Sequence, residues 1–552
     1  MFGMGEDSRF FVGVFVGTVL GMTIRLKSTL TASTNQNHVR EDDAEGQDFV
    51  TAGSVLLNWI VKYRTEMISS LPVVSRVEPN YLVKALPSHA PVLPESWISI
   101  FADLKRLIVP GLTHWESSAK FFAYFKPHAS YPAVLGELLC AGLNVMGFDW
   151  IASPACTELE MATLDWLARF LHLPDKFLHA APGPGGSVIQ GSAGEAAIVA
   201  CLAALCEKQR QWVTRGNGAA GNSTSSNSSS SSSVGGVGGG LQESGSELLP
   251  RQNMVVFSSD QAHAIVQKAC MVLGVGHHHI IPTSGVDGYA LQPGALRAAL
   301  EEEMARGRVP VLIVGTTGTT STCAFDPVRA LGEVAREFGV WLHIDAAYGG
   351  AYACLPQLRP LFDGLELADS FVVNCHKKLL CPFDLAAMYV ADRTPLLNAL
   401  SLQPEYLRNA ASESGAVVDY EHWQLPLGRR FRALKLWFVF RRYGQKQLQQ
   451  HLQRGLDLSA YFASLLEETG LFELVAPLSL SLVCFRLAGA RPETDQQRLL
   501  DAVKSSGDCF IIHTKLEGRI ALRLACGGME QTPADVYGAY QVILREARKI
   551  VL

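Results

Sequence analysis

The sequence lacks the cysteine patterns of metal sites and of disulfide frameworks. Its 12 cysteines are scattered over 552 residues, without a C-x-x-C pair and without metal-ligand spacing. In a chain of this size, scattered cysteines are typical of reduced, mostly buried thiols in a cytosolic enzyme. The histidines at residues 277–279 do not suggest a metal site either, because consecutive residues of a strand do not converge on one ion. We therefore expect no metal ion.

An excess of charge is also lacking. Lysine and arginine number 47 against 52 aspartate and glutamate residues, which gives a net charge of -5. This near balance excludes the general basic field expected of a nucleic-acid-binding protein. A hydrophobic content of 48% with 18% charged residues is typical of a globular protein, and the length allows two or three domains with a large shared core.

The apolar run near the N-terminus is short for a transmembrane helix. Residues 10–24 carry no charge, whereas a bilayer span needs roughly 20 residues. A weak membrane anchor, a targeting segment and a mispredicted start codon all fit this run. If it inserts uncleaved, the denser basic flank after it leaves the folded body in the cytoplasm. We expect residues 1–45 to form this apolar segment and a disordered linker, and we expect a cytoplasmic location.

A tract rich in serine and glycine interrupts the chain at residues 215–247. Such a composition cannot bury enough apolar surface to become ordered. Its Asn-x-Ser/Thr triplets match glycosylation acceptors, but matches of this kind arise by chance in a serine tract. We expect an exposed, disordered insertion between a helix and a strand.

The sequence around this tract alternates between the patterns of strands and helices. Small and apolar residues at 191–209 suit a long buried helix. Short apolar runs follow, separated by helix-compatible stretches, and this alternation predicts an α/β fold with a large, mostly parallel sheet. The runs lie at residues 253–259, 309–317, 340–348, 371–376 and 386–392.

Polar residues stand where several of these strands end, and ligands of parallel sheets bind beyond the carboxyl ends of the strands. At one such end, Asp345 either caps the next helix or pairs with a cation such as a protonated ring nitrogen. The glycine-rich residues 183–197 are either an ordinary turn or a helix start that binds phosphate. The strand-end residues are Ser258, Ser259, Asp260, Thr316, Thr317, Asp345, Asn374, Cys375 and His376.

Two adjacent lysines, Lys377 and Lys378, lie between two apolar runs, where an unpaired ammonium costs several kcal/mol. An apolar site lowers the pKa of a lysine, so that its neutral amine can form a Schiff base with an aldehyde. A lysine of this kind, a strand-end aspartate and a phosphate site are the parts that hold pyridoxal phosphate. His263 is either a core histidine or a member of this site.

From about residue 46 to the C-terminus, the chain resembles the group II pyridoxal-phosphate-dependent decarboxylases, and among them the aromatic-L-amino-acid decarboxylases. The matching segments include, in order, PGLTHWESSAKFFAYF, GFDWIASPACTELE, SSDQAHAIV, WLHIDAAYGG, NCHKKLL and LGRRFRALKLWFVFRRYG. The resemblance implies an aspartate-aminotransferase-like fold (fold type I) and a homodimer whose active sites lie at the subunit interface. The implied parts are an N-terminal helical dimerisation segment at residues 46–130, a large cofactor-binding domain at 131–434 and a small C-terminal α+β domain at 435–552.

The resemblance also implies roles for single residues. Lys377, which follows Asn-x-His, corresponds to the lysine that binds the cofactor, and Asp345 corresponds to the partner of its ring nitrogen. His263 and Ala347 correspond to residues on the two faces of the ring. The other implied positions are Ser192, Ala193, Thr320 and Asn374 around the cofactor, mainly its phosphate, and Trp115, Phe125 and Phe148 in the substrate pocket.

The implied reaction is decarboxylation of an aromatic L-amino acid (tryptophan, hydroxytryptophan, dopa or tyrosine) to its amine and carbon dioxide. Gly428 stands at a pocket position where the family's tyrosine and histidine enzymes tend to carry serine, so a larger ring has room. Tyr406 corresponds to the loop tyrosine that is the proton source in decarboxylases. An aldehyde synthase on the same scaffold and a catalytically inactive homologue that acts as a binding protein remain the alternatives.

Two residues depart from the family pattern. Lys378 follows the cofactor lysine, where tryptophan is usual, and Lys126 stands where proline is usual. A second cation beside Lys377 disfavours a protonated neighbour unless its side chain points away. Both departures bear on substrate preference more than on reaction type.

Overall fold

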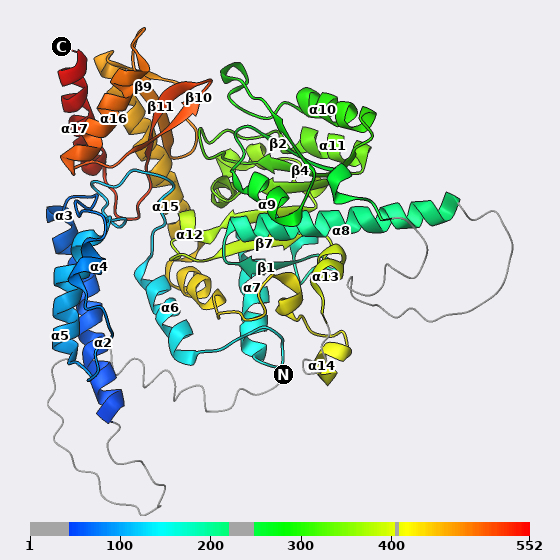
Figure 1. Ribbon diagram of the computed structural model, residues 1–552, viewed down its shortest axis with the longest axis horizontal. Coiled ribbons are helices and arrows are strands. Elements are labelled where there is room, and N and C mark those ends of the chain that lie inside the picture. Colours follow the sequence, from blue (N-terminus) through cyan, green and yellow to red (C-terminus); the bar gives the residue numbers. More distant parts are fainter. Residues whose placement is uncertain (1–43, 220–247, 403–407, 552) are drawn as a thin grey trace, which may run out of the picture. The chain divides into compact units, whose positions relative to one another are not determined.

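The computed structural model describes residues 44–219, 248–402 and 408–551 (Figure 1). The chain divides into two compact units, Met1–Ile60 and Val61–Leu552, and we treat each by itself. Of the first unit, the structure describes only residues 44–60, which belong to helix α2 (Ala44–Lys62). Residues 10–24, most of the Ser/Gly tract and Tyr406 lie outside the described residues. Within the described ranges, no helix combines the length and the apolar character that a membrane crossing needs.

A seven-stranded, mostly parallel sheet forms the centre of the second unit, with the strand order β1-β7-β6-β5-β4-β2-β3. Neighbouring strands from β6 to β3 run parallel, whereas β7 is antiparallel to both of its neighbours. This arrangement confirms the predicted fold class, although the apolar runs that predicted the sheet included neither β1 nor β3. The strands are β1 (Gly186–Gln190), β2 (Met254–Ser259), β3 (His277–Ile281), β4 (Val309–Thr316), β5 (Trp341–Asp345), β6 (Ser370–Asn374) and β7 (Ala386–Val390).

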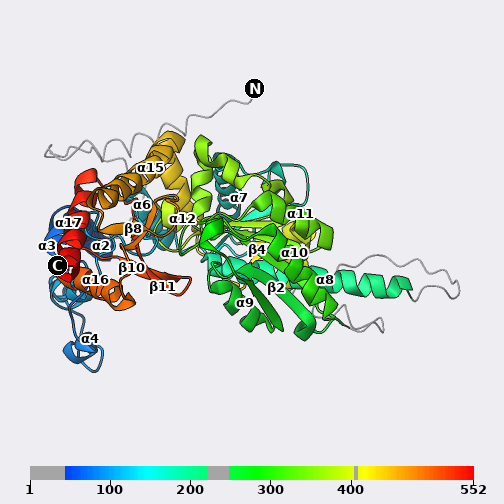
Figure 2. The same ribbon diagram turned by 90° about the horizontal axis from the view of Figure 1, so that it is seen from above.

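Different helices cover the two faces of this sheet. Val255 and Phe257 belong to the core that includes α7, α10 and α11, whereas Met254 and Val256 belong to the core that includes α8 and α9. Figure 2 shows α9 and the pair α10 and α11 on different sides of the strands. The helices are α7 (Pro154–Phe170), α8 (Ala193–Ala219), α9 (Ile265–Leu273), α10 (Pro293–Ala305) and α11 (Val328–Phe338).

Helix α8 is longer than the sequence pattern predicts. It runs to Ala219 and so includes residues 215–219, the first part of the tract that we expected to be disordered. Adding residues to an existing helix costs far less free energy than starting one, so a long helix can extend by a few residues into a sequence that would not form a helix by itself. The expected insertion therefore begins after this helix.

A smaller α+β region follows the large sheet. Its four strands form an antiparallel sheet in the order β10-β11-β9-β8, and the long helix α15 connects it to the large sheet region. The elements are α15 (Ala433–Thr469), β8 (Phe472–Leu474), β9 (Leu482–Leu487), α16 (Glu493–Ser506), β10 (Ile512–Leu516), β11 (Arg519–Ala525) and α17 (Pro533–Val551).

The segment from residue 61 to 130 contains only short helical pieces in addition to the end of α2. They are η1 (Tyr63–Met67), α3 (Ile68–Ser70), α4 (Tyr81–Ala85), α5 (Trp97–Asp103), η2 (Leu104–Ile108) and η3 (Val109–Gly111). The remaining α-helices of the described residues are α6 (Tyr131–Leu143), α12 (Cys375–Lys378), α13 (Thr394–Leu400) and α14 (Ala410–Glu413). All twelve cysteines are unpaired, and all except Cys206 are buried, which agrees with the expected burial of the thiols.

Candidate active site

Two adjoining cavities lie at the carboxyl ends of the parallel strands. The inner cavity measures about 280 Å³ and the outer cavity about 420 Å³, and both are lined by His263, Thr320 and Lys377. The inner cavity includes Thr316, at the end of β4, and Asp345, at the end of β5, which are paired in the parallel ladder. This is the edge of the sheet at which the polar strand ends predict a ligand.

Every residue that we expected around the cofactor lines the inner cavity. The segments that supply them are far apart in the sequence, and the parallel strand order brings them together because consecutive crossovers return to the same edge. The residues are Ser192, Ala193, His263, Thr320, Asp345, Ala347, Asn374 and Lys377.

Lys377 lies on the short helix α12, directly after β6, so its amine is close to the strand ends. Burial lowers the pKa of this amine, and the charge of Asp345 opposes part of the shift. Asp345 is buried and accepts a hydrogen bond at Oδ1 from the backbone N–H of Ala347 (3.0 Å). A lowered pKa increases the neutral, nucleophilic fraction of the lysine.

His263 follows β2 and borders both cavities. Its Nδ1 accepts a hydrogen bond from the backbone N–H of Ile265 (3.1 Å), so the neutral ring carries its proton on Nε2. Burial lowers the pKa of His263, and the charge of Asp345 opposes this shift. The imidazole is therefore favoured in its neutral form beside the inner cavity.

The start of helix α8 forms another side of the inner cavity through Ser192, Ala193 and Gly194. Ser192 Oγ accepts a hydrogen bond from the N–H of Glu195 (3.1 Å), and Glu195 Oε2 accepts one from the N–H of Gly191 (2.9 Å). This reciprocal cap orients the first turn of the helix. Free N–H groups and the helix dipole at such a terminus favour an anion.

Unsatisfied polar atoms complete the inner cavity. Among the described residues, the buried atoms Asn374 Oδ1 and Thr316 Oγ1 have no hydrogen-bond partner. Such atoms lower stability unless a ligand or water satisfies them. A lysine with a lowered pKa, a buried carboxylate, a helix N-terminus and free acceptors are the groups that pyridoxal phosphate requires, so the residues fit this cofactor.

Aromatic side chains line the outer cavity. Trp115 stacks on Tyr124 with 5.4 Å between ring centroids, and Phe125 stacks on Tyr348 with 3.5 Å between centroids. The guanidinium of Arg523 lies 5.2 Å from the centroid of the Phe125 ring. Flat apolar walls with few polar groups suit an aromatic side chain. The structure therefore brings Trp115 and Phe125, two of the expected pocket residues, into one cavity with Lys377.

Several residues of the outer cavity were missed in the sequence. Ile512 and Arg523 belong to β10 and β11, and no local pattern connects these strands with Trp115. His376, by contrast, was among the strand-end residues that the sequence analysis singled out. The missed residues of this cavity are Tyr124, Pro127, Phe383, Ile512 and Arg523.

Phe148 and Gly428 line neither cavity. They lie near each other instead, because the N–H of Gly147 donates to the carbonyl of Arg429 (3.2 Å). Gly428 is exposed, and a Cβ atom at this position would have no other atom within 4 Å. Within a single chain, the structure does not bring these two expected pocket residues to the others.

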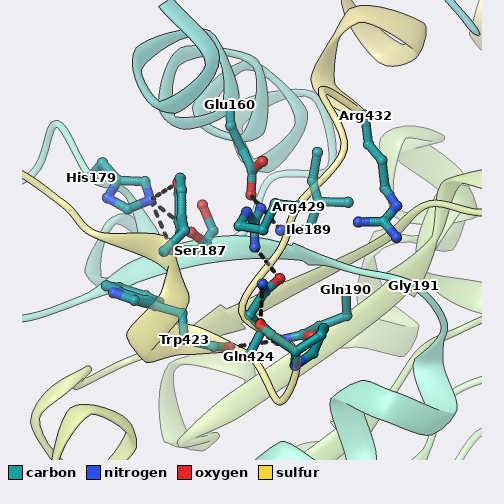
Figure 3. Close-up of polar contacts among 12 residues, drawn as sticks. Glu160, His179, Ser187, Ile189, Gln190, Gly191, Trp423, Gln424, Arg429 and Arg432 are labelled. Carbon is teal, nitrogen blue, oxygen red and sulfur yellow. Dashed lines mark hydrogen bonds and ion pairs between the residues drawn. The ribbon is translucent and has the colours of Figure 1, made fainter. Parts of the chain in front are cut away.

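A buried polar network that includes Glu160, Gln424 and Arg429 (Figure 3) lies at the base of the exposed residues 425–428. Arg429 donates from Nη2 to Glu160 Oε1 (2.5 Å) and from Nη1 to Gln424 Oε1 (2.7 Å). The Nε2 group of Gln424 in turn donates to the carbonyl of Leu427 (3.2 Å). Glu160 and Arg429 are each 1% exposed, so the base of this loop is held by a fully desolvated ion pair.

Comparisons with known proteins agree with this site. The sequence model of the family described as "Pyridoxal-dependent decarboxylase conserved domain" matches residues 79–231 and 241–488. The chain is 40% identical over 502 residues to a phenylacetaldehyde synthase of Arabidopsis thaliana, covering 90% of this chain and 95% of that protein. It is also 40% identical over 502 residues to an aromatic-L-amino-acid decarboxylase of Rattus norvegicus, covering 90% of this chain and 97% of that protein.

A solved structure, described as Oryza sativa TDC with PLP and tryptamine, has the same fold with a TM-score of 0.83. It is 33% identical and covers 93% of this chain and 100% of its own. These matches confirm the resemblance seen in the motifs and the assignment of the cofactor as pyridoxal phosphate. The chain belongs to the pyridoxal-dependent decarboxylase family.

Proposed function

We propose that this chain decarboxylates an aromatic L-amino acid (tryptophan, hydroxytryptophan, dopa or tyrosine) to the corresponding amine and carbon dioxide. One observation carries the proposal: the inner cavity with Lys377 and Asp345 opens into an outer cavity whose walls include Trp115 and Phe125. An amino acid whose reacting carbon is near Lys377 can then place its ring between aromatic side chains.

Pyridoxal phosphate, when bound, supplies an electron sink for the bond that breaks at the substrate Cα. Lys377 would hold the cofactor through its amine, and the carboxylate of Asp345 would accept the N–H of the pyridine ring. His263 and Ala347 would border the ring. The cavity residues that would support the phosphate and the rest of the cofactor are Ser192, Ala193, Thr320 and Asn374.

The other residues of the chain orient the substrate and handle its protons. Trp115 and Phe125 pack against the aromatic side chain and exclude water from the reacting bond. Tyr406, at the sequence position of the loop tyrosine, donates a proton to the substrate Cα after carbon dioxide has left. A phenol hydroxyl can donate this proton, whereas a phenyl ring cannot.

The alternative reaction is oxidative formation of an aldehyde on the same scaffold. A phenylacetaldehyde synthase among the relatives keeps this alternative in consideration. Tyr406 favours the decarboxylase, because plant aldehyde synthases of this family carry phenylalanine at the corresponding position. The complete set of inner-cavity residues argues against the third reading, an inactive homologue that serves as a binding protein.

We propose that the enzyme is a homodimer whose partner completes each active site. Phe148 and Gly428 lie outside the cavities of their own chain, and the half-buried Phe148 and exposed Gly428 are accessible to the outer cavity of a second copy. Leu135, Leu138 and Leu139 of α6 are exposed, and a cluster of exposed apolar side chains usually marks a surface that a partner covers. Gly428 then leaves room for a large ring.

We also propose that the enzyme works in the cytoplasm, where its free thiols are maintained. Residues 10–24 would add at most a weak association with membranes. Neither location changes the reaction proposed for the cavities.

The reaction is tested with the purified full chain, saturated with pyridoxal phosphate, on a panel of L-amino acids. We expect amine and carbon dioxide in equal amounts from tryptophan, hydroxytryptophan or dopa, with little hydrogen peroxide. Glutamate, serine and histidine are the matched controls and should react poorly. Aldehyde with stoichiometric peroxide would establish the alternative reaction, and the absence of turnover on every amino acid would overturn the proposed activity.

A further inference from the structure

Lys378 lies behind the wall of the outer cavity. Its side chain is only 4% exposed, and its Nζ donates a hydrogen bond to the carbonyl of Cys526 (2.8 Å). The same Nζ lies 5.3 Å from the centroid of the Tyr348 ring. The same ring also stacks on Phe125, and Phe125 lines the outer cavity. Lys378 is therefore linked to the outer cavity by the stacked rings of Tyr348 and Phe125.

Tyr348 is held from a second direction. Its hydroxyl is within 2.8 Å of Ser481 Oγ, which also lies 2.5 Å from the hydroxyl of Tyr352. These hydrogen bonds fix the end of the Tyr348 ring, whereas Lys378 contacts its face. The orientation of the ring, and with it that of Phe125, consequently depends on both contacts.

Lys126 follows Phe125 in the chain. Its side chain points to the turn at Gly527 and Gly528, directly after the Cys526 carbonyl that Lys378 contacts. Its Nζ donates to the carbonyl of Ser117 (3.2 Å), and a Cβ atom at Gly528 would lie 3.3 Å from this Nζ. A Cβ atom at Gly527 would lie 2.4 Å from the Nζ of Lys378. Two consecutive glycines thus provide the space that the two lysines occupy.

The same turn is bound to the segment before Phe125 by a glutamine. Gln531 Oε1 accepts a hydrogen bond from the N–H of Gly527 (2.7 Å), and its Nε2 donates to the carbonyl of Ser118 (2.9 Å). Lys126 and Gln531 therefore contact adjacent carbonyls, those of Ser117 and Ser118. The turn and the segment that carries Phe125 are joined at several points.

Among the residues that the structure describes, neither ammonium lies within salt-bridge distance of a carboxylate. No ion pair within 4.0 Å involves Lys126 or Lys378 among the described residues. Burial lowers the pKa of each lysine to about 8. Two buried, unpaired ammonium groups reduce stability, so packing alone does not account for them.

Several charged and titratable groups surround each lysine. For Lys378 they are Cys526, Cys323, Lys126 and His451, and for Lys126 they are Glu116, Glu530, Asp535, Arg64 and Lys378.

We propose that Lys378 is a positioning residue, which fixes the Tyr348–Phe125 stack as the wall for the substrate's aromatic ring, and that Lys126 supports it through the turn of Gly527 and Gly528. The inference rests on the proposed decarboxylase activity, because it assigns the stack to that substrate. Lys378 lines neither cavity, whereas Tyr348 borders the inner cavity and Phe125 borders both. Because Lys377 and Asp345 remain in place, removal of Lys378 should affect recognition of the substrate ring more than binding of the cofactor.

The test compares Lys378→Met and Lys126→Met in the full-length holoenzyme with Lys268→Met, which removes an exposed lysine of α9. For the best aromatic substrate at pH 7.5, we expect Lys378→Met to raise KM roughly fivefold, the size of a cation–π contact, with kcat changed less than about twofold. Lys126→Met should raise KM less, and Lys268→Met should match the wild type.

A pH series separates this role from a purely structural one. As the pH rises from 7 to 9.5, the Lys378 amine of the wild type loses its charge, so its contact with the Tyr348 ring weakens. The ratio of the Lys378→Met KM to the wild-type KM should therefore fall toward one. The ratio cancels the titration of the substrate. A constant ratio, or equal KM values at pH 7.5, would overturn the proposal.

Hydrogen exchange provides a readout that does not depend on turnover. We expect faster exchange of the backbone of residues 121–127 in both Lys378→Met and Lys126→Met than in Lys268→Met. If the wild type turns over no amino acid, the proposed activity fails, and the exchange alone decides the positioning role. If Lys378→Met does not fold, Lys126→Met decides it. Unchanged exchange in the folded variants would count against the inference.

Discussion

Lys377 and Lys378 are adjacent in the sequence but face different surroundings. Lys377 borders the inner cavity near Asp345, whereas Lys378 contacts the carbonyl of Cys526 and the ring of Tyr348. Both lysines lie on the four-residue helix α12. Their side chains point in different directions because successive side chains on a helix are about 100° apart. One lysine is thus available for the cofactor and the other for the pocket wall.

The first prediction follows from this difference. Lys377→Ala should abolish the visible absorption band of protein-bound pyridoxal phosphate, because the amine that holds the cofactor is lost. Lys378→Met should retain the band. The measurement is an absorption spectrum after removal of free cofactor. The opposite result, with the band lost only in the Lys378 variant, would show that the assignment of the two lysines is reversed.

Tyr406→Phe tests the proton source at the residue scale. Without the phenol hydroxyl, we expect amine output to fall at least about tenfold, within the range of a lost general acid, and aldehyde, ammonia and peroxide to rise. The visible band should persist, because the cofactor contacts are unchanged. Products are quantified by chromatography and peroxide by a coupled assay. Unchanged amine output would exclude Tyr406 as the donor.

Glu421 predicts a pH dependence of stability. Burial, with repulsion from Asp149 and Asp419, raises the pKa of Glu421 to about 7. The folded protein therefore binds this proton more tightly than the unfolded chain, so the contribution to stability is present below pH 4.5 and is lost as the pH rises through 7. Glu421→Gln should remove this loss.

The measurement is the Tm of the wild type and of Glu421→Gln between pH 5 and 8. The variant should have the higher Tm at pH 8, and its advantage should shrink as the pH falls. Glu333→Gln, at an exposed position of α11, is the control and should follow the wild type. Parallel curves for all three proteins would contradict the proposed titration of Glu421.

At the scale of elements, helix α6 has two different faces. Gly136 packs closely on α15, where a Cβ atom would lie 3.0 Å from the carbonyl of Leu434. Beside this contact the helix exposes Leu135, Leu138, Leu139 and Leu143, which have the spacing of one helical stripe. An apolar stripe of this size on one helix is typical of a covered interface.

We therefore expect Leu138→Asp to convert a dimer into monomers. The new charge would be buried at the interface without a partner, and a desolvated charge costs several kcal/mol. Light scattering after size exclusion measures the mass. Val286→Asp places the same charge at a position that is 95% exposed outside α6, and it should leave the dimer intact. A dimer that survives Leu138→Asp would place the interface elsewhere.

At the scale of the whole molecule, cofactor binding should stabilise the fold. Pyridoxal phosphate would satisfy Asn374 Oδ1 and interact with Lys377 and Asp345, and a ligand that binds only the folded state stabilises it by about 2.7 kcal/mol at 100 times its Kd. We expect a Tm rise of roughly 2–4 °C when the apoprotein is saturated. Pyridoxine, without aldehyde and phosphate, is the control. Equal Tm values with and without cofactor would contradict the assigned site.

The sequence by itself determined the features that depend on local patterns. Alternation of apolar runs with helical stretches predicted the mostly parallel sheet, and a parallel sheet places its strand ends on one edge. The positions of Asp345, Asn374 and Lys377 at that edge followed from this rule. The motif order then identified the cofactor, because motifs of this length are local in the chain.

Only the tertiary structure decided which distant segments meet. Arg523 and Trp115 border one cavity although they are far apart in the chain, and no periodicity records such a contact. The structure also placed Phe148 and Gly428 outside that cavity and directed Lys378 away from Lys377. The physical reason is that side-chain direction and long-range pairing result from packing over the whole chain, whereas the sequence pattern reports only the local periodicity.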